Sequence, residues 1–183
     1  MTTSDDVQEP RALVVFESMF GNTEKVARAV GDGLRASGVT TRVVEVTEAP
    51  AALPPSVDLL VVGAPTHAFS LSRPKTRIEA VRQGADLSKV AIGLREWLET
   101  ARPGGDGPVH VAVYDTRASK VRRLPAAAGP SAARLARRMK LASVDRPVAF
   151  LVGDIQGPLV EGEIDRAASW GRSLAATLPA AAR

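Results

Sequence analysis

The residues with the clearest chemical potential form a short polar turn between two segments of different periodicity. An apolar run begins at Val14, and after the turn apolar residues recur at helical spacing. Ser18 and Thr23 supply hydroxyl groups in this turn, and Asn22 supplies an amide. Gly21 lacks a Cβ, so a ligand oxygen can approach the backbone there. Because a helix start presents free backbone N–H groups and about half a positive charge, the turn suits an anion, most simply a terminal phosphate.

A purely structural role is the alternative for the same turn. Ser, Asn and Thr are favoured at the start of a helix, where their side chains accept hydrogen bonds from the first free N–H groups. Taken alone, the turn leaves both interpretations open. A phosphate site would need further loops, contributed by other strands, to hold the rest of the ligand.

Apolar segments that read as strands alternate with amphipathic segments along the chain. The segment 57–62 is apolar almost throughout, which suits a parallel strand covered on both faces. This alternation predicts one α/β domain, a doubly wound five-stranded parallel sheet in a three-layer α/β/α arrangement. We expect strands at 14–17, 40–46, 57–62, 109–114 and 147–152, and helices that end near 38, begin near 74, and span 90–101, 131–139 and 161–178.

The composition excludes several classes of function. The chain has no cysteine, which excludes disulfides, thiolate metal sites and cysteine nucleophiles. His67 and His110 are its two histidines, and neither has a cluster of other metal ligands near it in the sequence, so we expect no metal site. The net charge of +4 and the pI near 10 invite a nucleic-acid interpretation, but aromatic residues make up only 4% and form no base-stacking stripe. We therefore expect no nucleic-acid partner.

From the residue pattern we expect neither a targeting segment nor a membrane helix. No apolar run approaches the roughly 20 residues of a membrane helix, so we expect no membrane partner. Residues 1–10 are polar and acidic, with no basic start and no apolar core of a signal peptide. We expect a flexible N-terminal tail over 1–10, a single domain over 11–183 and a cytoplasmic location. The sequence leaves the oligomeric state open.

Other phosphate-binding and catalytic patterns fit less well. The sequence contains neither G-x-x-x-x-G-K-[ST] nor G-x-G-x-x-G. A response-regulator receiver would need an aspartate at the end of the third strand, where Gly63, Ala64 and Pro65 stand. As a hydrolase nucleophile, Ser18 lacks the G-x-S-x-G turn that would expose it.

The polar turn resembles a known phosphate loop. Its order, hydroxyl-x-x-Gly-Asn-Thr over 18–23 directly after the first strand, is similar to that of the flavodoxin family. The segment 63–69, Gly-Ala-Pro-Thr-His-Ala-Phe, looks like the first ring-binding loop of that family. The resemblance covers the order of elements from Arg11 to the end of the chain. It implies strand order 2-1-3-4-5, in which the loops after strands one, three and four open onto one crevice.

The resemblance implies FMN as the cofactor. Backbone groups around Thr66 and His67 would meet the polar edge of the flavin ring, and His67 or Phe69 would flank its face. Trp97 and Trp170 are expected to support the core instead. The implied cofactor-binding residues are Ser18, Met19, Phe20, Gly21, Asn22, Thr23, Pro65, Thr66, His67, Ala68, Phe69, Asp115, Thr116 and Arg117.

Two features depart from the family pattern. Phe20 stands where flavodoxins usually carry a third hydroxyl. The third loop is basic where many flavodoxins have a tyrosine and an acidic cluster, and Tyr114 comes too early, still within the expected strand. The cations after strands three and four either form a basic rim around the ring or point into solvent and reflect codon bias: Arg73, Lys75, Arg77, Arg117, Lys120, Arg122 and Arg123.

These patterns lead to one expected function and one alternative. We expect an FMN-binding, flavodoxin-like oxidoreductase of electron transport, which carries electrons or, as a small NAD(P)H-linked reductase, reduces quinone-like acceptors. Its partner would be a redox protein with an acidic docking surface or a small quinone-like acceptor. The alternative is a flavodoxin-fold binding or regulatory module that has lost the flavin. Phe20 and the basic third loop favour the alternative, whereas the Gly-Asn-Thr and Pro-Thr-His segments favour FMN.

Overall fold

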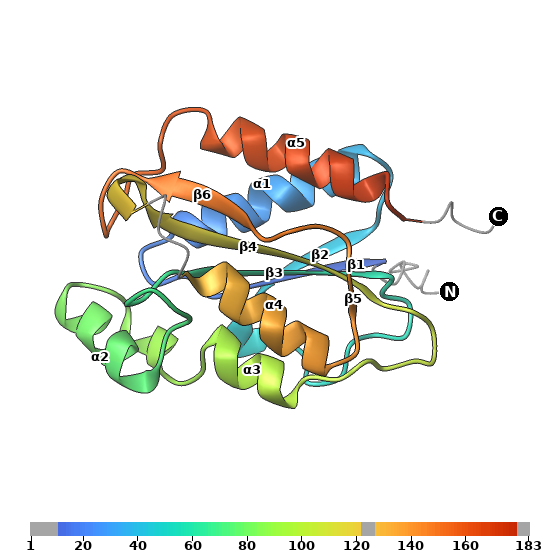
Figure 1. Ribbon diagram of the computed structural model, residues 1–183, viewed down its shortest axis with the longest axis horizontal. Helices are drawn as coiled ribbons and strands as arrows, with labels where there is room; N and C mark the ends of the chain where they lie inside the picture. The colour runs from blue at the N-terminus through green and yellow to red at the C-terminus, as the bar shows by residue number, and fades with distance from the viewer. Residues whose placement is uncertain (1–10, 122–126, 179–183) are drawn as a thin grey trace, which may run out of the picture.

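The fold is a parallel sheet between two layers of helices (Figure 1). The computed structural model describes residues 11–121 and 127–178. The expected N-terminal tail, 1–10, and the rim residues Arg122 and Arg123 lie outside the described residues. Within them, no helix combines the length and the apolar character that a membrane span requires.

The sheet confirms the expected strand order 2-1-3-4-5, with every neighbouring pair parallel. Two short segments share the fifth position: β5 pairs with the beginning of β4, and β6 pairs with its end. The strands are β1 (Ala12–Phe16), β2 (Thr41–Glu45), β3 (Leu59–Pro65), β4 (His110–Ala118), β5 (Ala142–Ser143) and β6 (Val148–Val152).

The helices cover both faces of the sheet because successive side chains of its central strands point to opposite sides. Leu13 and Val15 of β1 pack on the α3–α4 side, whereas Val14 and Phe16 pack on the α1–α5 side. Trp97 is buried on the α3–α4 side, as expected of a core residue. The helices are α1 (Asn22–Ala36), α2 (Pro74–Arg82), α3 (Leu94–Thr100), α4 (Ala128–Arg138) and α5 (Glu163–Ala175), with short 3-10 turns η1 (Val46–Glu48), η2 (Leu87–Val90) and η3 (Ser119–Val121).

The strands β3 and β4 are longer than the sequence pattern predicts. β3 continues through Gly63 and Ala64 to Pro65, which were expected in a loop. β4 includes Asp115, Thr116 and Arg117, so placing these three residues in the third loop is wrong. The extension is stabilised by pairing on both sides, with β3 up to Thr116 and with β6 up to Ala118. A polar segment can therefore remain a strand, because its neighbours supply the hydrogen bonds.

The helix boundaries also shift by a few residues. α4 begins three residues before the expected Ser131, and α5 spans 163–175 rather than 161–178. Ile164 in the first turn of α5 is 42% exposed, and the buried residues of this helix are Glu163, Ala167, Gly171 and Leu174. Glu163 is held inward because it accepts a hydrogen bond from the backbone N–H of Leu151 (2.8 Å).

Candidate functional site

A cavity of about 400 Å³ opens at the carboxyl ends of β1, β3 and β4. This is the edge of an open parallel sheet at which ligands generally bind. The cavity lies where the three predicted segments meet, and twelve of the fourteen predicted site residues line it; Gly21 and Asp115 do not. The twelve are Ser18, Met19, Phe20, Asn22, Thr23, Pro65, Thr66, His67, Ala68, Phe69, Thr116 and Arg117.

The turn between β1 and α1 combines a left-handed glycine with free backbone donors. Gly21 has φ +83°, which an L side chain adopts only with strain, and directly precedes the first residue of α1. Within the part of the chain that the structure describes, the backbone N–H groups of residues 19–23 donate to no acceptor. Such free donors at a helix start form a ready anion site.

The polar side chains of this turn are engaged within the protein. The Ser18 hydroxyl accepts a hydrogen bond from the backbone N–H of Glu24 (3.2 Å), so Ser18 caps the first turn of α1. The hydroxyls of Thr23 and Thr116 lie 2.8 Å apart, and the amide of Asn22 donates to the backbone oxygen of Gln156 (3.0 Å). The capping interpretation is therefore correct for Ser18, while the backbone of the same turn keeps its donors for a ligand.

The segment after β3 is a tight two-residue turn. His67 and Ser70 exchange backbone hydrogen bonds of 2.8 and 3.0 Å, and Ala68 and Phe69 between them have φ of 45° and 62°. Two left-handed residues in succession usually require Asn-Gly, so this conformation costs about 1–3 kcal/mol for each residue. The turn leaves the Phe69 side chain 51% exposed at the cavity.

This turn changes which backbone groups can meet a ligand. The N–H of Thr66 donates to the backbone oxygen of Thr116 (2.9 Å), and that of His67 donates to Ser70. These two N–H groups are therefore already used within the protein. In the described residues, the N–H groups of Ala68 and Phe69 have no acceptor, and they remain available.

Thr66 also joins the turn to α4. Its hydroxyl accepts a hydrogen bond from the backbone N–H of Ala128 (3.1 Å) and donates to Asp115 (3.4 Å). Asp115 in turn accepts from the N–H of Gly129 (3.1 Å) and is fully buried. Asp115 thus holds the start of α4 in place and lies beneath the cavity wall.

The cations expected at the rim are partly neutralised. The Arg117 guanidinium makes two hydrogen bonds to the Asp115 carboxylate, of 2.6 and 2.5 Å. Arg77 is 1% exposed and pairs with Glu96 at 3.2 Å, so its assignment to a solvent-facing rim is wrong. Arg73, Lys75 and Lys120 remain exposed.

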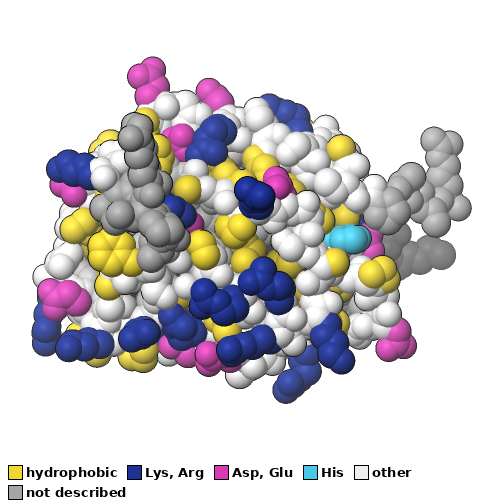
Figure 2. All heavy atoms as spheres, viewed as in Figure 1, with side chains coloured by type: hydrophobic (Ala, Val, Ile, Leu, Met, Phe, Trp, Pro, Cys, Tyr) yellow, Lys and Arg dark blue, Asp and Glu magenta, His cyan; other side chains and the backbone are white. Residues whose placement is uncertain are grey.

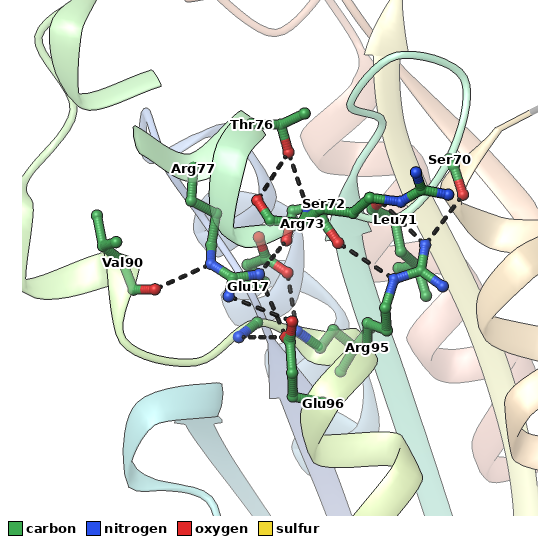
Figure 3. Close-up of polar contacts among 12 residues, drawn as sticks. Glu17, Ser70, Leu71, Ser72, Arg73, Thr76, Arg77, Val90, Arg95 and Glu96 are labelled. Atoms are coloured by element: carbon green, nitrogen blue, oxygen red, sulfur yellow. Dashed lines mark hydrogen bonds and ion pairs between the residues drawn. The ribbon is translucent and has the colours of Figure 1, made fainter. Parts of the chain in front are cut away.

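A polar network around the buried side chains of Glu17 and Arg77 joins the end of β1 to α2 and α3 (Figure 3). One Glu17 oxygen accepts a hydrogen bond from the backbone N–H of Leu94 (2.8 Å), and the other has no partner among the described residues. Arg77 donates to Ser72 (2.9 Å) and to Glu96. Burial raises the pKa of Glu17, against smaller lowering effects from Ser72, Leu94 and Arg77 and a raising effect from Glu96. The network fixes the inner side of α2 and the segment that follows the turn.

His67 lines the cavity and carries a neutral side chain. Burial, with a smaller contribution from the positive charge of Arg77, lowers the pKa of His67 to about 4. The imidazole is therefore uncharged at neutral pH, and it can donate or accept a hydrogen bond without adding charge to the site.

Several cavity residues were missed by the sequence reasoning. One set lies on α2 at helical spacing, and that spacing is a signal that could have found it. A second set comes from the end of β4, the end of β6 and the loop that follows β6, for which no local pattern exists. The missed residues are Thr76, Glu79, Ala80, Gln83, Ala118, Val152 and Ile155.

Comparisons with known proteins place this geometry in context. The family model for flavodoxin matches residues 14–86, which include the first turn and the β3 turn. Flavodoxin 1 from Bacillus cereus aligns at 16% identity and a TM-score of 0.63, over 92% of this chain and 99% of that one. No curated protein sequence gives a significant match.

Two further solved structures extend the comparison. A flavodoxin from the domain Archaea aligns at 15% identity and a TM-score of 0.59, over 90% of this chain and 96% of that one. The flavodiiron protein from Giardia intestinalis aligns at 19% identity and a TM-score of 0.58, over 90% of this chain and 35% of that longer one. These matches confirm the flavodoxin fold and the resemblance to the flavodoxin family.

Proposed function

We propose that this chain of flavodoxin fold binds FMN in the cavity and acts as a flavin redox protein. The observation that carries the proposal is the set of free backbone N–H groups at 19–23, at the start of α1 and at the cavity. A phosphate there would gain charge-assisted hydrogen bonds, each contributing about 1.5–3 kcal/mol. The cavity volume lies within the usual range for a small-molecule site, which supports a mononucleotide.

The surrounding residues fit the remaining parts of such a ligand. Met19 and Ala80 belong to one apolar cluster and supply apolar surface to the cavity wall. The free N–H groups of Ala68 and Phe69 suit the polar edge of a ring, and Thr116 and Arg117 complete the wall at the end of β4. Bound FMN would supply one- and two-electron transfer, and the chain would orient it and limit its exposure to water.

The exposed apolar rim supports transfer to an external acceptor. Phe69 and Ile155 both line the cavity and are 51% and 66% exposed. A planar quinone-like acceptor or an apolar patch of a partner protein can contact such side chains without displacing the ligand below. We therefore assign the chain either electron carrying or the reduction of quinone-like acceptors.

A binding or regulatory module without flavin is the second candidate. It is favoured by Phe20, which replaces a family hydroxyl, and by the side chains of Ser18 and Thr23, which already hydrogen-bond within the protein. With these side chains engaged and no hydroxyl at position 20, the phosphate of FMN would be bound by backbone N–H groups alone, which would weaken its binding. The two candidates differ in one measurable property, the affinity for FMN.

The deciding experiment is a titration of apo protein with FMN and, in parallel, with riboflavin, followed by quenching of flavin fluorescence. The two ligands differ only in the phosphate. We expect FMN to bind at least about 100-fold more tightly than riboflavin, since two charge-assisted hydrogen bonds would account for that difference. Absence of quenching by FMN would favour the flavin-free module. Equal affinities for the two ligands would show that the first turn is not a phosphate site.

The redox role requires a second measurement on FMN-loaded protein. After chemical reduction, the rate of reoxidation by benzoquinone tests transfer to quinone-like acceptors. Consumption of NADH or NADPH in the steady state tests whether the chain is a reductase. Rapid reoxidation without any use of nicotinamide would identify a carrier that depends on a separate reductase.

A further inference from the structure

The solvent face of α4 carries cations and no acidic residue. Arg134, Arg137 and Arg138 are exposed, and the remaining residues of the helix are apolar or uncharged. Lys140 follows two residues after the helix end and is exposed as well. Figure 2 shows Lys and Arg side chains gathered in a band over the face formed by α2, α3 and α4.

Most arginines of the other helices are paired with acids, whereas, within the described residues, Arg95 on α3 and Arg172 on α5 bond only to serine or backbone oxygens. α1 pairs Arg28 with Glu24, α2 pairs Arg82 with Glu79, and α5 pairs Arg166 with Glu163. Across the described ranges 11–121 and 127–178, no acidic group lies within 4.0 Å of Arg134, Arg137 or Arg138. Among the α-helices that the structure describes, α4 is the one without Asp or Glu, and a general enrichment in arginine does not account for that absence.

The helix dipole accounts for only part of the pattern. Arg137 and Arg138 lie in the last turn of α4, where a cation is favoured by about 0.3–1 kcal/mol. Arg134 lies one turn earlier, and Arg102 belongs to the segment after α3. These two cations gain little from the α4 dipole, and the face is left with an unbalanced positive charge.

A hollow of about 370 Å³ lies beside this face, between α3 and α4. Leu98, Leu135 and Met139 line it, together with the cations Arg102, Arg138 and Lys140. Glu99 is its single acidic lining residue among those described. The hollow can take an apolar side chain of a partner, while the cations around it contact carboxylates.

The start of α4 is fixed to the proposed redox site. The N–H of Ala128 donates to Thr66, and the hydroxyls of Ser131 and Ser70 lie 3.2 Å apart. Thr66 and Ser70 flank the turn that carries Phe69. At 1.5 Å rise per residue, the eleven residues of α4 span about 16 Å, so a protein seated along the helix would reach the cavity.

From these observations we propose that the α4 face, defined as Arg102, Arg134, Arg137, Arg138 and Lys140, is a docking surface for a protein partner with an acidic patch. The partner's identity as the electron donor or acceptor rests on the proposed function, whereas the docking does not. Charge complementarity of this kind steers association and makes its rate depend on salt. A protein surface is favoured over nucleic acid because the hollow has aliphatic walls and, within the described residues, no aromatic side chain for base stacking.

The test uses poly-L-glutamate as the acidic polypeptide probe, with binding followed by fluorescence anisotropy of labelled probe. Wild-type protein should bind it at about 20 mM salt and at least about tenfold more weakly at about 200 mM, where the Debye length falls to about 7 Å. R134E/R137E should bind at least about tenfold more weakly than wild type at the lower salt. The matched control is R42E/R172E, which makes the same change in net charge on β2 and α5.

Melting temperatures establish that both variants are folded. The proposal is overturned if R42E/R172E weakens binding as much as R134E/R137E, because the effect would then follow from net charge alone. It is also overturned if a DNA duplex, or vesicles of phosphatidylcholine with phosphatidylserine, bind wild type more tightly than poly-L-glutamate at the higher salt. Binding of the probe needs no flavin, so a failure of FMN binding and a failure of docking are separate results.

Discussion

The hydroxyl of Tyr114 donates a hydrogen bond of 3.0 Å to the backbone oxygen of Thr23. This bond fastens the middle of β4 to the first turn of α1, across the α1–α5 side of the sheet. Thr23 also faces Thr116 through its side chain, so β4 holds the start of α1 at two points. The position of the proposed phosphate site therefore depends on β4 as well as on the turn itself.

Replacing Tyr114 with Phe should weaken both stability and FMN binding. Loss of this buried hydrogen bond should lower the free energy of unfolding by about 0.5–1.5 kcal/mol. Because the start of α1 loses one fixed point, FMN affinity should fall as well. Trp97→Phe is the control, since it removes a partly buried hydrogen bond to Pro50 on the other side of the sheet. Denaturant unfolding and FMN titration of both variants should show affinity lost in Tyr114→Phe alone.

Gly63→Ala should be among the most damaging single changes. A Cβ at position 63 would lie 1.9 Å from the Tyr114 ring, in the tightly packed interior of β3 and β4. Overpacking of this kind costs about 1–3 kcal/mol or more. In Gly63→Ala/Tyr114→Leu the clash is removed, so the combined loss should be smaller than the sum of the two single losses. Additive losses in chemical denaturation would contradict this contact.

Phe20→Thr should strengthen FMN binding. The change supplies the hydroxyl that the family resemblance places there, and a hydrogen bond to phosphate is worth about 1.5–3 kcal/mol, or about 10- to 100-fold in affinity. Phe20→Val has nearly the shape of Thr without the hydroxyl, so it corrects for loss of the aromatic ring. If the dissociation constant for FMN is no lower in Phe20→Thr than in Phe20→Val, position 20 does not contribute to the phosphate site.

Glu17 should make the protein less stable as pH rises. Burial raises the pKa of Glu17 above its ordinary value of 4.5, so the folded state binds this proton more tightly than the unfolded state does. Stability from this group is complete below about pH 4.5 and is lost as pH rises through the folded pKa. Glu17→Gln should remove that dependence, and exposed Glu99→Gln should keep it. Unfolding measured across this range should give parallel pH curves for wild type and Glu99→Gln, and a flatter one for Glu17→Gln.

His67 should act in the opposite direction. Its pKa is lowered to about 4 from 6.5, so the unfolded state takes up a proton first as pH falls. Stability from neutral His67 is complete above about pH 6.5 and is lost as pH falls toward 4. Proton NMR of the imidazole, assigned with His67→Asn, should show a midpoint near 4. A midpoint near 6.5 would mean that the ring is solvated rather than packed in the cavity wall.

Much of the proposed site could be predicted because its parts are contiguous in the sequence. The first turn needs only a strand end, a glycine and a helix start, and these lie within residues 14–23. The β3 turn was located for the same reason. Its hydrogen bonds were not predicted, because the exchange between His67 and Ser70 depends on two left-handed residues that are neither glycine nor asparagine.

The ion pairs of the charged residues could not be predicted from local sequence. One joins residues far apart in the chain, and the other depends on how a strand orients its side chains. Arg77 is a helical cation in the sequence, and Glu96, nineteen residues later, makes it a buried ion pair. From the sequence pattern, Asp115 and Arg117 are predicted to lie in the polar loop that follows the fourth strand. Their places in β4 put both side chains on the same side of the sheet, where they form an ion pair.

The sequence by itself determined the alternation of strands and helices and the first turn, since apolar periodicity and turn residues act over a few neighbouring positions. Only the tertiary structure decided the length of β4, because β3 and β6 provide its hydrogen bonds from either side. It likewise brought α2 and Ile155 to the cavity and placed the α4 arginines where no acidic side chain of residues 11–121 or 127–178 pairs with them. Such features depend on contacts between segments far apart in the chain, and these contacts cannot be predicted from local periodicity.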